Sequence, residues 1–362
     1  MSANVSTHYI SEKVSRVRWL PEQLLQSERF ITGSWDMDRN FVRLWKLQSN
    51  QYATANTAAA ADNVELMPRC MDKVSMEDDV TGMEFVDKDT LAVTTADGRL
   101  SLMNVQRAVE EDQMHLTARS EQLHSFQRSQ EPAPCTDISV YGTDIATAGE
   151  DGCVNILSAS NIRQVKRNIE ADSLALFAVS FVSQNQLVAA NRMGVIRMLD
   201  VRVASEAQPK VNFMVACKDD KSSNFVSSIT SHPMQQHILL CGTEEGSITV
   251  WDLRNLEYPA SYLNAHSSPI TDIGFHRKDP SKLFTAAEAG EVWMWSENKV
   301  LTCDNPKDGS SAWLSGDRVK SLVGVEGVLT NIRKAINSFD VHGTRLVCGG
   351  DSEAVYLIDD IV

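Results

Sequence analysis

The sequence predicts an all-β protein, a single closed β-propeller of seven blades that occupies residues 1–362. One pattern recurs seven times: an apolar strand, a tight turn, and a second strand that ends in a bulky apolar residue. The copies follow one another at about 52 residues, longer than the usual blade of about 40 to 45 residues, and insertions account for the excess. Apolar and polar residues alternate after each turn, so each strand offers one face to a neighbouring sheet.

The seven copies differ in how clearly they show the pattern. It is clearest in residues 238–252, 283–296, 187–200, 145–157 and 91–103, and looser in residues 30–45 and 346–359. The turns are predicted at positions 40, 98, 152, 194, 246, 290 and 353, and five of these are glycine. Glycine suits a tight hairpin because it adopts a positive φ without steric cost.

Each copy needs a first strand before it and an outer strand after it. Apolar segments such as residues 14–19 and 270–275 supply the first strands. Inserted loops are predicted near residues 48–76, 106–133, 203–222 and 297–335, and each must also contain an outer strand. Residues 7–10 are then free to pair with the last blade as its outer strand. This pairing would close the ring and remove exposed sheet edges.

Charge and composition exclude several classes of partner. The formal net charge is −14, whereas nucleic-acid binding depends on lysine and arginine that neutralise phosphates. We therefore expect no direct nucleic-acid contact. Membrane insertion is not expected either, since no apolar run approaches the roughly 18–20 residues of a spanning helix. The first residues lack the basic and apolar regions of a secretory leader.

The seven cysteines are expected to be reduced residues of the core. Their number is odd, and no two of them have a Cys-x-x-Cys spacing. Most lie inside apolar strands, as Cys241 and Cys348 do, and a buried free thiol behaves as a small hydrophobic group. This pattern is typical of a protein from a reducing compartment.

The sequence shows no catalytic, cofactor-binding or metal-binding motif. None of the eight histidines forms a His-x-x-x-His pair or lies near a cysteine pair. Adjacent acids such as Asp359 and Asp360 point to opposite faces of a strand, and no phosphate-binding loop or nucleophile elbow occurs. We therefore predict a non-catalytic protein-binding scaffold. His266, at the start of a blade, is interpreted as a structural hydrogen-bonding residue.

Trp313 and Leu314 are the candidate partner-binding residues. The tryptophans at the strand ends, Trp45, Trp251 and Trp295, are interpreted as core, whereas Trp313 lies in a long insertion outside every repeat position. Aromatic anchors of this kind are enriched at interface hot spots. An alternative is a loop tryptophan that folds back onto the propeller. The interface interpretation predicts that Trp313→Ala weakens partner binding and leaves melting nearly unchanged.

The repeats resemble the WD-repeat family, which implies a WD40-type propeller. Trp251-Asp252 is the signature dipeptide, and Leu199-Asp200 and Trp295-Ser296 are partial versions of it. Most copies lack the tryptophan or the aspartate, so we expect the family's structural hydrogen-bond tetrad to be incomplete in most blades. A closer resemblance, to the forty-three-kilodalton WD-repeat nucleoporin family, is carried by residues 9–19, 32–36, 133–136, 149–152, 346–349 and 353–356.

That resemblance implies a structural nucleoporin of the Y-shaped outer-ring subcomplex at the nuclear envelope. It implies a monomer within a hetero-complex, with other Y-complex nucleoporins as partners, among them an α-helical stem nucleoporin of the short arm. It also implies roles in pore assembly, messenger-RNA export and protein transport, with kinetochore association in some lineages.

Two alternatives remain from the sequence. Trp251-Asp252-Leu253-Arg254 fits the Trp-Asp-x-Arg pattern of substrate receptors of cullin-type ubiquitin ligases, and residues 199–202 partly repeat it. The second alternative is a propeller enzyme. It predicts acids or histidines from several blades that converge on the central channel.

Overall fold

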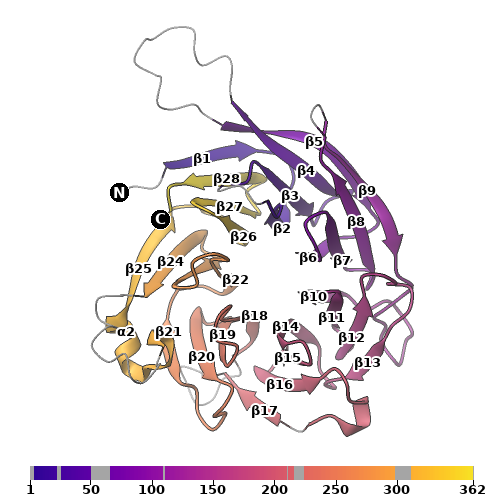
Figure 1. The fold of residues 1–362 in the computed structure, drawn as a ribbon, viewed down its shortest axis with the longest axis vertical. Helices are drawn as coiled ribbons and strands as arrows, with labels where there is room; N and C mark the ends of the chain where they lie inside the picture. Colours follow the sequence, from indigo (N-terminus) through magenta and orange to yellow (C-terminus); the bar gives the residue numbers. More distant parts are fainter. Residues whose placement is uncertain are drawn as a thin grey trace.

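The computed structural model describes residues 4–22, 26–49, 66–108, 111–209, 211–215, 224–297 and 311–361. These residues form seven four-stranded antiparallel sheets around one central axis (Figure 1). The predicted all-β, seven-bladed propeller is confirmed. The described part of the chain contains no helix long and apolar enough to cross a membrane.

Each blade uses four strands from the inside of the ring to its rim. Blade 1 consists of β2 (Val14–Trp19), β3 (Arg29–Ser34), β4 (Asn40–Ser49) and β5 (Leu66–Met76). Blade 2 consists of β6 (Val80–Phe85), β7 (Thr90–Thr95), β8 (Leu100–Gln106) and β9 (Gln113–Arg119). Blade 3 consists of β10 (Cys135–Tyr141), β11 (Asp144–Gly149), β12 (Cys153–Ser158) and β13 (Arg167–Glu170).

The remaining blades follow the same order, except that the last strand of blade 7 comes from the start of the chain. Blades 4 to 7 consist of β14 (Leu176–Ser183), β15 (Gln186–Asn191), β16 (Val195–Asp200) and β17 (Val211–Met214); β18 (Val226–Ser231), β19 (Ile238–Thr243), β20 (Ser247–Asp252) and β21 (Ser261–Asn264); β22 (Ile270–Phe275), β23 (Lys282–Ala287), β24 (Glu291–Glu297) and β25 (Val323–Leu329); and β26 (Ile336–His342), β27 (Arg345–Gly350), β28 (Ala354–Asp359) and β1 (Asn4–Tyr9).

Strand β1 closes the ring by pairing antiparallel with β28. Its register runs from Asn4 opposite Asp359 to Tyr9 opposite Ala354, and the two strands lie side by side (Figure 1). The predicted closure is confirmed. The strand covers residues 4–9 rather than 7–10, because Asn4, Val5 and Ser6 also pair with β28.

Glycine occupies the turn between the second and third strands in five blades. Gly290 shows why, since its φ is +81° and an added Cβ would lie 1.9 Å from the backbone oxygen of Ile332. Blade 1 differs from the prediction, because Asn40 is the first residue of β4 and the left-handed position is taken by Asp36, with φ of +53°. Blade 7 places Glu353 there with φ of +55°.

The core consists of seven apolar clusters, one at each interface between neighbouring blades. The cluster between blades 4 and 5, for example, joins Ala178 and Phe213 to Leu239 and Trp251. The bulky residues that end the third strands are all buried there: Trp45, Met103, Leu157, Leu199, Trp251, Trp295 and Ile358. The core role predicted for Trp45, Trp251 and Trp295 is therefore confirmed.

In blade 6, a four-residue hydrogen-bond chain joins the sheet to His266, which lies in the connection before β22. The His266 Nδ1 atom lies 3.2 Å from Glu291 Oε2 and its Nε2 atom lies 2.8 Å from Thr285 Oγ1, which accepts from Trp295 Nε1 at 3.0 Å. A carboxylate only accepts, so Nδ1–H donates to Glu291 and the Thr285 hydroxyl donates to Nε2. Burial lowers the pKa of His266, which favours this neutral ring. The structural role predicted for His266 is confirmed.

Other blades keep only parts of this chain. Blade 3 has His124 between Thr147 and Asp151, with ring-nitrogen distances of 2.9 Å to each, but Leu157 replaces the tryptophan. Blade 1 retains the bond from Trp45 Nε1 to Thr32 Oγ1 at 2.9 Å. In blade 5, Trp251 Nε1 is buried without a hydrogen-bond partner among the described residues.

The missing partner of Trp251 has a simple cause in the sequence. Cys241 stands where blades 1 and 6 have Thr32 and Thr285, two residues after the residue that pairs with the tryptophan. We expect Cys241→Thr to raise the free energy of unfolding by about 1 kcal/mol, because the hydroxyl can accept from the indole N–H. Urea unfolding measures the change. Cys241→Val has the shape of threonine without its hydroxyl, and equal stability of the two variants would contradict the explanation.

Candidate protein-binding surfaces

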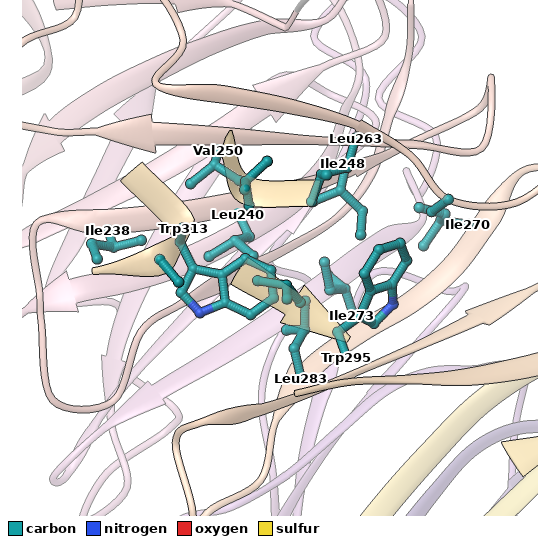
Figure 2. Packing of buried hydrophobic residues seen from close by; sticks show 14 residues of the cluster. Ile238, Leu240, Ile248, Val250, Leu263, Ile270, Ile273, Leu283, Trp295 and Trp313 are labelled. Carbon is teal, nitrogen blue, oxygen red and sulfur yellow. The ribbon is translucent and has the colours of Figure 1, made fainter. Parts of the chain in front are cut away.

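Trp313 lies inside the core, between the rims of blades 5 and 6. It belongs to a short inserted segment formed by η2 (Ala312–Leu314), η3 (Gly316–Arg318) and α2 (Val319–Leu322). Its side chain is 0% exposed. Figure 2 shows the indole in the same cluster as Leu240, Leu283 and Trp295.

The inserted segment is held by a buried serine and an aromatic contact. The Ser261 hydroxyl donates to the backbone oxygen of Trp313 at 2.6 Å and accepts from the backbone N–H of Gly316 at 3.1 Å. The ring of Phe275 meets the indole edge to face, with centroids 6.0 Å apart. The segment therefore docks on strands β21 and β22, and Trp313 seals the contact.

This burial corrects the expectation that Trp313→Ala would leave melting unchanged. A side chain that packs inside the interblade cluster cannot be removed without loss of apolar contacts. The structure agrees instead with the alternative interpretation, a loop tryptophan that folds back onto the propeller. Leu314 is half-buried beside it, and Val325 on β25 is 50% exposed. The sequence analysis did not single out Val325.

Charged side chains gather in the central channel, around a cavity of about 470 Å³ lined by the first strands. Arg18 of blade 1 is one of the residues that line it. One guanidinium nitrogen of Arg18 lies 3.4 Å from Glu84 Oε1, and the other lies 4.0 Å from Asp272 Oδ2. These contacts connect blade 1 to blades 2 and 6 across the channel.

The channel acids bind backbone groups of the next blade. Asp137 Oδ2 accepts from the backbone N–H of Val179 at 2.8 Å, and Asp340 Oδ2 accepts from that of Trp19 at 2.8 Å. Acids from several blades therefore do converge on the channel, as a propeller enzyme would require. Asp137 and Asp340 form hydrogen bonds between blades. The sequence analysis missed both residues because they lie in first strands, outside the repeat copies on which it was based.

Asp137 gives the channel a pH-dependent contribution to stability. Burial raises the pKa of Asp137 to about 6, above the value of about 3.9 in an unfolded chain. A raised carboxyl pKa contributes stability below pH 4 that is lost as the pH rises through 6. We expect Asp137→Asn to stabilise the protein by about 1–2 kcal/mol at pH 8 and by less at pH 5.

Urea unfolding at the two pH values tests this prediction. Asp317→Asn is the control, because Asp317 is an exposed carboxylate of the inserted segment. This variant removes a carboxylate outside the channel and is the reference for the Asp137→Asn measurements. An Asp137→Asn effect that does not change with pH would contradict the assignment.

The Trp-Asp-x-Arg motif closes a turn on the face opposite the glycine turns. Arg254 Nε donates to Asp252 Oδ1 at 2.8 Å, and in blade 4 Arg202 Nε donates to Asp200 Oδ1 at 2.9 Å. Both arginine side chains remain 65% exposed. Since the same pair occurs in two blades, the motif has a local structural role.

The structure brings together no metal-binding cluster in its described ranges. Within them, no group of three or more His, Cys, Asp or Glu side chains is placed to hold an ion. Cys70, Cys135, Cys153, Cys241 and Cys348 are free thiols, and burial raises the pKa of Cys153 to about 12. Cys217 and Cys303 lie outside the described residues.

The protein is a closed ring of seven WD-type blades, and acids in its channel form hydrogen bonds between neighbouring sheets. These features define a propeller scaffold. The family described as "Nucleolar protein 10-like, N-terminal domain" matches residues 132–312, half of the sequence, and the chain belongs to this family of β-propeller domains.

Curated relatives extend the match to the whole ring. Nucleoporin Nup43 of Homo sapiens is 27% identical over 96% of this chain and 97% of its own length. Nuclear pore complex protein NUP43 of Arabidopsis thaliana is 26% identical over 69% of each chain. The Dictyostelium discoideum protein nup43 is 26% identical over 62% of this chain and 53% of its own. The chain is therefore a Nup43-like propeller nucleoporin, a structural component of the nuclear pore complex.

Proposed function

We propose that this chain is a non-catalytic scaffold subunit of the Y-shaped outer-ring subcomplex, docked on an α-helical stem nucleoporin of the short arm. Through that contact it supports pore assembly, messenger-RNA export and protein transport, and it accompanies the subcomplex to kinetochores in mitosis. The observation that carries the proposal is the similarity to Nup43, which covers 97% of the human relative and includes all seven blades.

The rim of blade 6 is the proposed docking surface for the stem nucleoporin. Trp313 is the buried support of this surface, and Leu314 and Val325 are its accessible apolar side chains. Residues 324–327 of the outer strand β25 are all exposed, so the strand presents a free edge. An apolar ridge beside an open edge suits the side of an amphipathic helix.

Affinity purification of the tagged full chain from nuclear extract tests this proposal. Stem nucleoporins should be identified among the co-purifying proteins and should be lost with Val325→Lys, which places a charge in the apolar contact. Leu116→Lys on the outer strand β9 is the matched control, since Leu116 is 48% exposed. Recovery of a ligase adaptor instead, abolished by Arg254→Ala, would favour the cullin alternative.

A further inference from the structure

An apolar cleft of about 480 Å³ opens at the mouth of the channel, on the face that carries the glycine turns. More of its exposed lining is apolar than polar, in contrast to the charged cavity at the other end of the channel. Its apolar side chains come from blades on both sides of the mouth: Trp35, Val80, Ala96, Phe225, Pro269 and Ile270.

The indole of Trp35 is fixed in this cleft before any ligand arrives. Trp35 Nε1 donates to Asp351 Oδ1 at 3.2 Å, and the same oxygen accepts from Asn337 Nδ2 at 2.8 Å. Trp35 is half-buried, so one part of the ring packs on the propeller and the other part faces the cleft. A rigid aromatic wall lowers the entropy cost of binding.

Acidic side chains surround the cleft. Four of the seven residues that directly follow the second strands line the cleft, and these are Trp35, Ala96, Glu244 and Glu288. Glu244 and Glu288 both line the cleft and are exposed. Neither carboxylate has a hydrogen-bond or ion-pair partner among the residues that the structure describes. Both are therefore available to an incoming cation.

The floor of the cleft carries the opposite charge. Arg16 lies there, and its guanidinium donates a hydrogen bond to the backbone oxygen of Ser15 at 3.1 Å. A lysine or arginine side chain that entered deeply would meet this guanidinium and be repelled. Cationic groups thus belong at the rim, beside Glu244 and Glu288, and an apolar group belongs in the centre.

We propose that this cleft binds an extended basic peptide segment of a partner protein. The segment places one apolar side chain against Trp35 and Phe225, and its lysine or arginine side chains pair with Glu244 and Glu288. The site lies on a face of the ring, away from the rim of blade 6. It is therefore a second binding activity, beyond attachment to the pore scaffold.

Fluorescence anisotropy with the full chain tests the proposal. The probe is a labelled seven-residue peptide with a central leucine between arginines and lysines. Two matched peptides replace the leucine with serine or the basic residues with glutamate. We expect only the first peptide to bind well. Glu244→Gln combined with Glu288→Gln should weaken it about 3- to 10-fold at low salt, and Trp35→Ala should weaken it by about 10-fold or more.

The control removes the same charge from the opposite face. Glu206 and Glu257 are exposed in the loops after β16 and β20, and their paired change to glutamine should leave the affinity unaltered. Absence of binding, equal binding of the acidic peptide, or an equal loss in this control would overturn the proposal. If Trp35→Ala unfolds the protein, the glutamine pair decides alone. Co-purification of pore subunits should persist in the glutamine pair, so the two proposals fail independently.

Discussion

Trp313→Ala is expected to lower the free energy of unfolding by about 3–5 kcal/mol, the range for removing a large, fully buried aromatic side chain. The indole fills the space between blades 5 and 6 and contacts the Phe275 ring, so alanine leaves a cavity that the rigid sheets cannot close. Urea unfolding followed by circular dichroism measures the loss. A change below about 1 kcal/mol would mean that the inserted segment is not docked in solution.

Trp313→Phe is the informative control for this measurement. Trp313 Nε1 is buried without a hydrogen-bond partner in the described ranges, so phenylalanine loses no hydrogen bond. We expect Trp313→Phe to cost less than about 1.5 kcal/mol, because most apolar contacts remain. If phenylalanine is as damaging as alanine, the indole N–H has a partner after all.

Trp251→Ala should produce a loss of similar size, about 3–5 kcal/mol, at a different interface. Trp251 is 2% exposed and packs on Phe213 of blade 4, with ring centroids 4.7 Å apart. Its removal therefore weakens the contact between blades 4 and 5 rather than the fold of one sheet. Chemical denaturation again measures the effect, with Tyr258→Ala as the control for an exposed aromatic residue.

The two interfaces can be compared directly. Phe213 comes from the outer strand β17, so Trp251 also ties the rim of blade 4 to blade 5. A loss well under 1 kcal/mol, as at a surface site, would contradict the view that the residues ending the third strands join the blades. We also expect Trp251→Ala to lower the free energy of unfolding more than Leu199→Ala does, because the leucine side chain is smaller.

The sequence predicted the blades well because their signals are local. Gly98, Gly152 and Gly246 mark hairpins whose two strands lie within a few residues of each turn. Blade 1 was harder, since no glycine fixes its turn and Asp36 takes the left-handed position instead.

The binding surfaces were harder to predict, because they are formed by residues that lie far apart in the sequence. Trp313 is buried among apolar side chains of blades 5 and 6, and its backbone oxygen accepts a hydrogen bond from Ser261, 52 residues earlier. No local sequence pattern indicates these contacts. The cleft at the channel mouth joins Trp35 of blade 1 to Glu288 of blade 6, which become neighbours only after the ring has closed. Patterns within one blade cannot show which side chains face each other across the axis.

The pairing of β1 with β28 sets the order in which the molecule can be completed. Strand β1 is synthesised before every other strand of the ring, yet its pairing partner β28 is the last of them to be made. The ring thus stays open until β28 has been synthesised, and blade 7 exposes the edge of β28 until β1 pairs with it. A contact of such large sequence separation is slow to form. Synthesis of β28, rather than of any earlier strand, is the step that lets this propeller close.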